Sequence, residues 1–495
     1  MGDIRDIIRG ALSSLFGFGG RLFARAILMI FAGHWYGMSV VGGLGQVAAI
    51  TEIAATFGVL GLKRSLLDML SYRAERGQSI EQRLVEAIIL SVGLGLILSV
   101  IMIFAWPFIE PQTARILPLL FLGIPAIVLT EVALSAIKFK RVIKWDVLSR
   151  GITEPWSFLI LAVIFYKIGL TQTGLVMAYC GSLIISALTV GIGLCSVYGV
   201  RSLLSARPKL ANILKIPKQS LPVGLTDLGV MMLRRVDILV LGVFVPQNVT
   251  GIYYILQQLA TIPQRVNNLF EPMVSPVIAR LHNQYKKEGI RANLVSICRW
   301  IFIIQLALSI PMVLFGDFIL SWFGPGFSAG IVSLAIILLA ELIDGSFITT
   351  ETALLYAQPK LPQWILFIGL VVEVIMIALC SHLWGLEGAA IGFLLGIITI
   401  TLGRLLMLKR KMGIMVLTPD YFSTVIIGAV MTAVLIVARV LAQGHHGLWM
   451  VFAIFIALTL YVYLTRAFSL TKTDKIIWRA FTHKKSKRSH RRESR

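Results

Sequence analysis

Five arginines lie in the middle of long apolar stretches, where a charge costs about 2.5–3.5 kcal/mol. Arg21 and Arg25 are four residues apart, so on a helix their guanidinium groups share one face. A guanidinium group offers a planar fork of N–H donors that matches phosphate or carboxylate oxygens. We therefore expect a cationic cavity for an anionic substrate, lined by Arg21, Arg25, Arg234, Arg235 and Arg265. The alternative is that these arginines only pair with acids across helices and fix the packing.

Acidic residues in the same kind of stretch are candidates for coupling transport to an ion. Asp237 follows Arg234 by three residues, which allows a local ion pair on one helix. Glu341 and Asp344 have the same spacing, but they are like charges, which suits a proton-coupling site. The coupling candidates are Glu52, Asp227, Asp237, Glu341 and Asp344, while Glu131, Glu351 and Glu373 are expected to serve packing.

The elements that position these charges are predicted to be membrane-spanning helices. The chain has 495 residues, 57% hydrophobic and 14% charged, with a mean hydropathy of +0.85. Apolar runs of about 20 residues recur, and in lipid such spans must be helical. We predict an all-α integral membrane fold with about 14 spans, near residues 8–32, 38–61, 84–106, 114–137, 147–167, 173–199, 220–245, 249–280, 295–318, 328–356, 362–384, 386–409, 420–442 and 447–468.

The formal net charge of +22 is distributed in a way that predicts topology. Lysines and arginines gather in alternate loops and in the tail, whereas the opposite set of loops holds only Lys167. The positive-inside rule then places both termini in the cytoplasm. The basic run at 484–495 is expected to contact anionic lipid head groups. We expect no nucleic-acid role, because no folded reader domain accompanies this run.

Landmarks repeat along the chain at one offset. Gly37 and Gly251, Gly174 and Gly388, and Arg21 and Arg235 are each 214 residues apart. This predicts two parallel six-helix lobes, an arrangement in which transporters place substrate between the halves. The expected divisions are an N-lobe at 1–200, a basic cytoplasmic linker at 201–219, a C-lobe at 220–411, two added spans at 412–468 and a basic tail at 469–495.

Motifs for enzyme or cofactor chemistry are absent from the sequence. It contains no Walker loop, no GxSxG elbow, no HExxH and no CxxC pair. We therefore expect neither a catalytic site nor a cofactor or metal. Uphill transport would then depend on an ion gradient, of protons or sodium, or on the gradient of the substrate itself.

Several segments resemble polysaccharide transporters. These are residues 237–244 (DILVLGVF), 251–254 (GIYY), 276–281 (PVIARL) and 384–392 (WGLEGAAIG). The chain is similar to the Wzx-like branch of the multidrug/oligosaccharidyl-lipid/polysaccharide (MOP) exporter superfamily. The resemblance implies a V-shaped, monomeric flippase of the bacterial inner membrane. It would move undecaprenyl-pyrophosphate-linked oligosaccharide to the periplasmic leaflet for O-antigen, capsule or exopolysaccharide export, with a polymerase and a chain-length regulator as partners.

Two other functions remain open from the sequence. A multidrug antiporter of the same superfamily would favour acids in its cavity, whereas here the mid-span arginines are prominent. A membrane polysaccharide polymerase or ligase would need a sizeable outer loop, and the loops predicted on that side are short.

Overall fold

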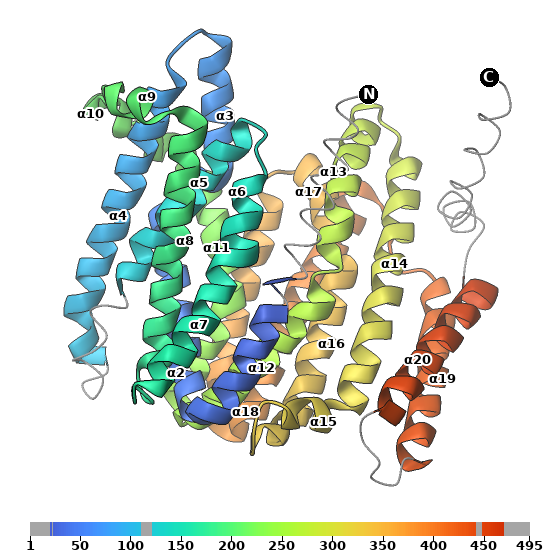
Figure 1. Cartoon of the computed structure of the whole chain (residues 1–495). Helices are drawn as coiled ribbons and strands as arrows, with labels where there is room; N and C mark the ends of the chain where they lie inside the picture. Colours follow the sequence, from blue (N-terminus) through green and yellow to red (C-terminus); the bar gives the residue numbers. More distant parts are fainter. Residues whose placement is uncertain (1–19, 22, 110–120, 442–447, 470–495) are drawn as a thin grey trace, which may run out of the picture. The chain divides into compact units, whose positions relative to one another are not determined.

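The computed structural model describes residues 20–21, 23–109, 121–441 and 448–469. These residues form helices and turns without a β-strand (Figure 1). Nine helices among them are long and apolar enough to cross a membrane. The all-helical membrane fold is thus confirmed. The basic tail and the start of the first expected span lie outside the described residues.

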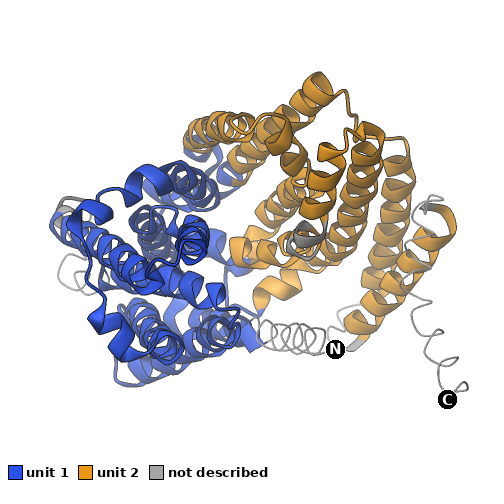
Figure 2. Cartoon of the chain, turned by 90° about the horizontal axis from the view of Figure 1, so that it is seen from above, with its two compact units in different colours: residues 1–255, 322–327, 381–389 blue, residues 256–321, 328–380, 390–495 orange. Residues whose placement is uncertain are grey.

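The chain divides into two compact units, coloured separately in Figure 2. Unit 1 comprises residues 1–255, 322–327 and 381–389, and unit 2 comprises 256–321, 328–380 and 390–495. The first stretch of unit 1 contains η1 (Ala32–Tyr36), α2 (Gly37–Val59), α3 (Leu62–Glu75), α4 (Ile80–Ile109), α5 (Gly123–Phe139), α6 (Lys144–Asp146), η3 (Val147–Thr153), α7 (Glu154–Lys167), α8 (Gly174–Tyr198), α9 (Val200–Ser205), α10 (Leu210–Ile213), α11 (Ile216–Phe244) and the first half of α12 (Gln247–Gln264). The lobe boundaries expected from the 214-residue offset stay a prediction.

Unit 2 holds most of the remaining helices. It contains α13 (Asn267–Asn283), α14 (Lys287–Leu314), α15 (Gly316–Ser321), α16 (Ile331–Phe347), α17 (Thr350–Ala357), most of α18 (Leu361–Met412), α19 (Asp420–Leu441), α20 (Leu448–Leu464) and η5 (Thr465–Ser469). The short η4 (Phe327–Gly330) begins at the boundary. In this unit Met431, Leu435 and Tyr461 bring α19 and α20 into one apolar cluster with Ile303 of α14.

A described helix underlies each of the fourteen predicted spans. The helical stretch Phe23–Glu75 carries two of them, and so does α18. Within α18 the backbone breaks at Gly385, whose φ of 55° and ψ of −122° are not helical. That residue separates the spans predicted at 362–384 and 386–409. Glycine suits this position because a left-handed φ carries no Cβ penalty there.

Three predicted spans are helical without being among the nine apolar helices. The described part of the 114–137 span is the short helix α5, and the 249–280 span is two helices, α12 and α13. Helix α11 is not among the nine apolar helices because it carries several charges, which include Asp227, Arg234, Arg235 and Asp237. A spanning helix this polar needs protein or water against its charged face, not lipid.

Helix α2 packs against the start of α12 through a glycine. A Cβ added to Gly42 would lie 2.0 Å from the carbonyl oxygen of Gln247 and 2.8 Å from the amide nitrogen of Gly251. Those are backbone atoms, so they cannot rotate away as a side chain would. Small residues allow this kind of close helix contact in membrane proteins.

We predict that Gly42→Ala lowers thermal stability, because one methyl group must push two helices apart. Overpacking of this kind costs about 1–3 kcal/mol. The measurement is the melting temperature of the purified protein in detergent. Gly93→Ala in α4 is the matched control, since nothing lies within 4 Å of its added Cβ. Equal melting temperatures for the two variants would contradict the close packing.

Candidate functional site

A cavity of about 390 Å³ lies within unit 1 and is lined by an unusual number of charges. Its walls come from the helical residues that precede η1, from α2, α3, α5, η3, α7, α8 and α11, and from Tyr254 of α12. The basic lining residues are Arg21, Arg25, Lys63, Arg64, Arg150 and Arg234, and the acidic ones are Glu52, Glu131, Glu154 and Asp227.

Helical periodicity explains why α11 serves this cavity. Asp227, Val230, Met231 and Arg234 all line it, and they follow one another at the i, i+3, i+4 and i+7 spacing of a single helix face. Arg21 and Arg25 likewise present one face, as their spacing predicts. Segments about 200 residues apart in the sequence therefore supply arginines to the same space.

Two acids of the lining are already neutralised by lining cations. Glu131 forms ion pairs with Arg150 and with Lys63, the latter at 3.3 Å. Asp227 lies 3.4 Å from the guanidinium nitrogen of Arg64. These contacts join α3 to α5, α5 to η3 and α3 to α11. They give Glu131 the packing role expected of it and place Asp227, a coupling candidate, in an ion pair.

Arg235 and Glu52 form a third pair. The Nε atom of Arg235 donates to Glu52 Oε2 at 2.7 Å and ties α11 to α2. Both residues were predicted to have functional roles, the arginine in substrate binding and the acid in coupling. In this structure each neutralises the other, and Arg235 does not line the cavity.

Asp237 has partners other than the neighbour three residues before it. Its carboxylate is buried and accepts hydrogen bonds from the Tyr253 hydroxyl at 2.9 Å and the Ile238 N–H at 2.8 Å. Arg234 forms no ion pair with any described residue. The local pair between Asp237 and Arg234 that the spacing allows is therefore not formed.

Three arginines of the cavity keep their charge available. Within the described ranges, Arg21, Arg25 and Arg234 form no ion pair, although all three line the cavity. The lining as a whole has more basic than acidic side chains. The arrangement can therefore accept an anion that is bound by several guanidinium groups at once.

The other predicted residues belong to unit 2. Arg265 is the first of the two turn residues between α12 and α13. Glu341 in α16 is buried and accepts a hydrogen bond from Gln264 at 3.2 Å. Its neighbour Asp344 pairs with Arg404 of α18 at 2.7 Å.

Arg404 is shared between two acids. It also binds Glu351 of α17 at 2.8 Å, which agrees with the packing role expected of that acid. Arg404 is almost fully buried inside α18. From the sequence this arginine counted among the loop cations that define topology.

Several cavity residues were missed by the sequence analysis. Lys63, Arg64 and Arg150 counted as loop cations, and Glu154 was not considered. Hydropathy assigns charges near the end of a span to the loop, although here they turn inward. The four-residue spacing of Arg150 and Glu154, the same as that of Arg21 and Arg25, was the available signal.

Comparison with solved structures identifies the fold. The lipid II flippase MurJ, in an inward closed conformation, gives a TM-score of 0.71 at 15% identity, over 93% of this chain and 98% of that one. An inward-facing multidrug resistance MATE family transporter of the MOP superfamily gives a TM-score of 0.63 at 15% identity, over 80% of this chain and 94% of that one. A mutant of the Vibrio cholerae MATE transporter VcmN gives a TM-score of 0.54 at 13% identity, over 82% of this chain and 97% of that one.

Comparison of the sequence identifies the family. No curated protein matches the chain significantly. Residues 12–282, more than half of the chain, match the family described as polysaccharide biosynthesis protein. The resemblance to a polysaccharide family with the fold of MOP superfamily transporters is thereby confirmed. The chain is a multi-pass membrane protein with the MOP transporter fold, and it belongs to the polysaccharide biosynthesis protein family.

Proposed function

We propose that the protein is a Wzx-like flippase. It moves undecaprenyl-pyrophosphate-linked oligosaccharide repeat units across the bacterial inner membrane for O-antigen, capsule or exopolysaccharide export. Family membership and the transporter fold support this reading. The observation that carries it is the unit 1 cavity, in which Arg21, Arg25 and Arg234 form no ion pair with any described residue.

The cavity suits a pyrophosphate for a simple electrostatic reason. A pyrophosphate esterified at both ends keeps an ionised oxygen on each phosphorus atom, and planar guanidinium forks bind such oxygens in pairs. Of the four lining acids, Glu131 and Asp227 pair with Lys63, Arg150 and Arg64, and Glu52 pairs with Arg235. Glu154 is then the one lining acid without an ion pair among the described residues, against three such arginines, so a net positive charge is left for the substrate. A cationic drug would meet the excess of basic groups instead, which disfavours the antiporter alternative.

The transport cycle in this proposal is alternating access coupled to a proton or sodium gradient. The protein carries out no catalytic step and needs no cofactor. The coupling acids would come from Glu52, Asp227, Asp237, Glu341 and Asp344. Both termini would lie in the cytoplasm, because the basic loops are on that side. The protein would act as a monomer beside a polymerase and a chain-length regulator.

The first test is genetic. Deleting the gene should abolish one surface or exported polysaccharide, while its lipid-linked repeat unit accumulates inside the cell. The measurements are the extracted polymer and the lipid-linked precursor, with the reintroduced wild-type gene as the control. Normal polymer export in the deletion strain would contradict the proposal.

The second test separates binding arginines from packing arginines. Arg21→Ala and Arg234→Ala should reduce export about tenfold or more at unchanged protein level, because each removes a charge-assisted hydrogen bond to substrate. Lysine at either position should rescue export only in part. Arg291→Ala is the control, since this arginine is exposed and pairs with Glu288 at the surface. Wild-type export in both alanine variants would assign these arginines to packing.

Arg235 should behave differently from those two arginines. Arg235→Met leaves the partly buried Glu52 without its partner, so the amount of folded protein should fall. Adding Glu52→Gln removes the stranded charge and should restore the folded protein. Yield after size-exclusion chromatography measures both effects. If the double variant gave no more folded protein than Arg235→Met alone, the loss of folded protein would not be due to the unpaired Glu52 charge.

The third test addresses coupling in unit 2. Asp344→Asn should change how transport in membrane vesicles depends on an imposed proton gradient. Glu351→Gln is the matched control, because it removes the other carboxylate that binds Arg404. An unchanged gradient dependence in Asp344→Asn would reject this residue as the coupling acid. The same change in both variants would assign the effect to the loss of Arg404 pairing.

A further inference from the structure

The segment from the end of α8 into the first turn of α11, residues 199–218, combines exposed apolar side chains with exposed cations. Val200, Leu204, Leu210 and Leu214 are 54%, 81%, 70% and 68% exposed. Between residues 199 and 219 the sequence has no aspartate or glutamate. Its basic residues, all exposed, are Arg201, Arg207, Lys209, Lys215 and Lys218.

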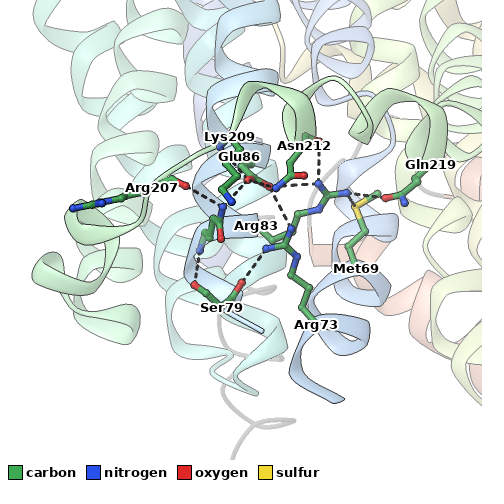
Figure 3. Close-up of polar contacts among 10 residues, drawn as sticks. Met69, Arg73, Ser79, Arg83, Glu86, Arg207, Lys209, Asn212 and Gln219 are labelled. Atoms are coloured by element: carbon green, nitrogen blue, oxygen red, sulfur yellow. Dashed lines mark hydrogen bonds and ion pairs between the residues drawn. The ribbon is translucent and has the colours of Figure 1, made fainter. Parts of the chain in front are cut away.

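A polar cluster around Glu86 holds this segment in place (Figure 3). Glu86, at the start of α4, is fully buried and forms ion pairs with Arg73 at 3.7 Å and Arg83 at 3.5 Å. It also accepts hydrogen bonds from the Lys209 N–H at 3.2 Å and the Asn212 side-chain amide at 3.0 Å. One buried carboxylate therefore joins α3, α4 and the segment before α11.

The cluster contacts the segment largely through hydrogen bonds to the backbone atoms of the segment. Gln82 donates to the carbonyl oxygen of Arg207 at 2.9 Å, and Arg83 donates to that of Asn212 at 3.2 Å. Arg83 also reaches the side chain of Gln219 in α11 at 2.7 Å. Figure 3 shows the Arg207 side chain extending away from the cluster. The backbone is thus fixed while the basic side chain faces outward.

We propose that residues 199–218 form a surface that binds anionic phospholipids at the membrane boundary. The segment begins one residue after α8, a candidate span that ends at Tyr198, so it leaves the bilayer at head-group depth. Exposed leucines there can enter the acyl-chain boundary, and cations beside them can bind lipid phosphates. If the segment faced only water, its four large apolar side chains would stay hydrated and its basic side chains would have no anionic partner.

Lipid-selective quenching of a fluorophore tests this surface in the full-length protein. Leu210→Cys is labelled with bimane in a Cys195→Ala background, because Cys195 is the least buried of the native cysteines. Nanodiscs contain the same fraction of brominated phosphatidylglycerol or brominated phosphatidylcholine. We expect the anionic lipid to quench about twofold more strongly. Leu188→Cys on α8, where the residue is 64% exposed, is the control and should show no preference.

Removing the charges should remove the preference. Arg207→Gln, Lys209→Gln and Lys215→Gln together should bring the quenching ratio at position 210 to that of the control. Raising the salt to 1 M should also remove the lipid preference at position 210 when the basic residues are unchanged, since the Debye length falls to about 3 Å. The salt arm keeps the test valid if the triple variant does not fold. Equal quenching by the two lipids at position 210, or no quenching by either, would overturn the proposal.

Discussion

The cost of holding a charged side chain in hydrocarbon governs how this chain is built. In unit 1 Arg235 meets Glu52, and in unit 2 Arg404 meets Asp344 and Glu351. Each pair joins helices that are distant in the sequence, so one contact both neutralises a charge and fixes the packing. Once such a pair is in place, losing either member strands the other charge, which costs more than the attraction that was lost. Charge pairing is therefore a constraint on the whole fold.

The unit 1 cavity is where that constraint is not satisfied by the described protein alone. Its acids Glu131 and Asp227 are engaged by Lys63, Arg150 and Arg64, while three other arginines have no acid of the described residues within ion-pair distance. A polar cavity can keep such groups solvated until an anion arrives. In the proposed function, the substrate supplies the missing counter-charge. This is the physical link between the electrostatics of the lining and the lipid-linked pyrophosphate that we propose as the substrate.

Much of the fold could be predicted from the sequence, because hydrocarbon thickness fixes span length and loop cations mark the span ends. The break at Gly385 falls between two predicted spans. The site was predicted less completely. Arg21, Arg25 and Arg234 were found because they interrupt apolar runs, whereas Arg150 and Arg404 were assigned to loops. Hydropathy locates a charge along the membrane normal but does not say whether it turns toward lipid, water or another helix. Which acid pairs with which arginine depends on helix packing, and one sequence does not contain that information.

Helix α11 shows how packing assigns different roles to charges that are adjacent in the sequence. With 3.6 residues per turn, successive side chains point about 100° apart. Arg234 lines the cavity, while Arg235 turns to Glu52 on α2. Asp237 could pair with Arg234 by spacing, yet it accepts a hydrogen bond from Tyr253 on α12 instead. Seen down the helix axis, Arg235 and Asp237 project to opposite sides of Arg234, so their two contacts hold α11 against both α2 and α12. A guanidinium group carried between such anchors is already positioned before an anion binds, so less ordering is needed at that moment.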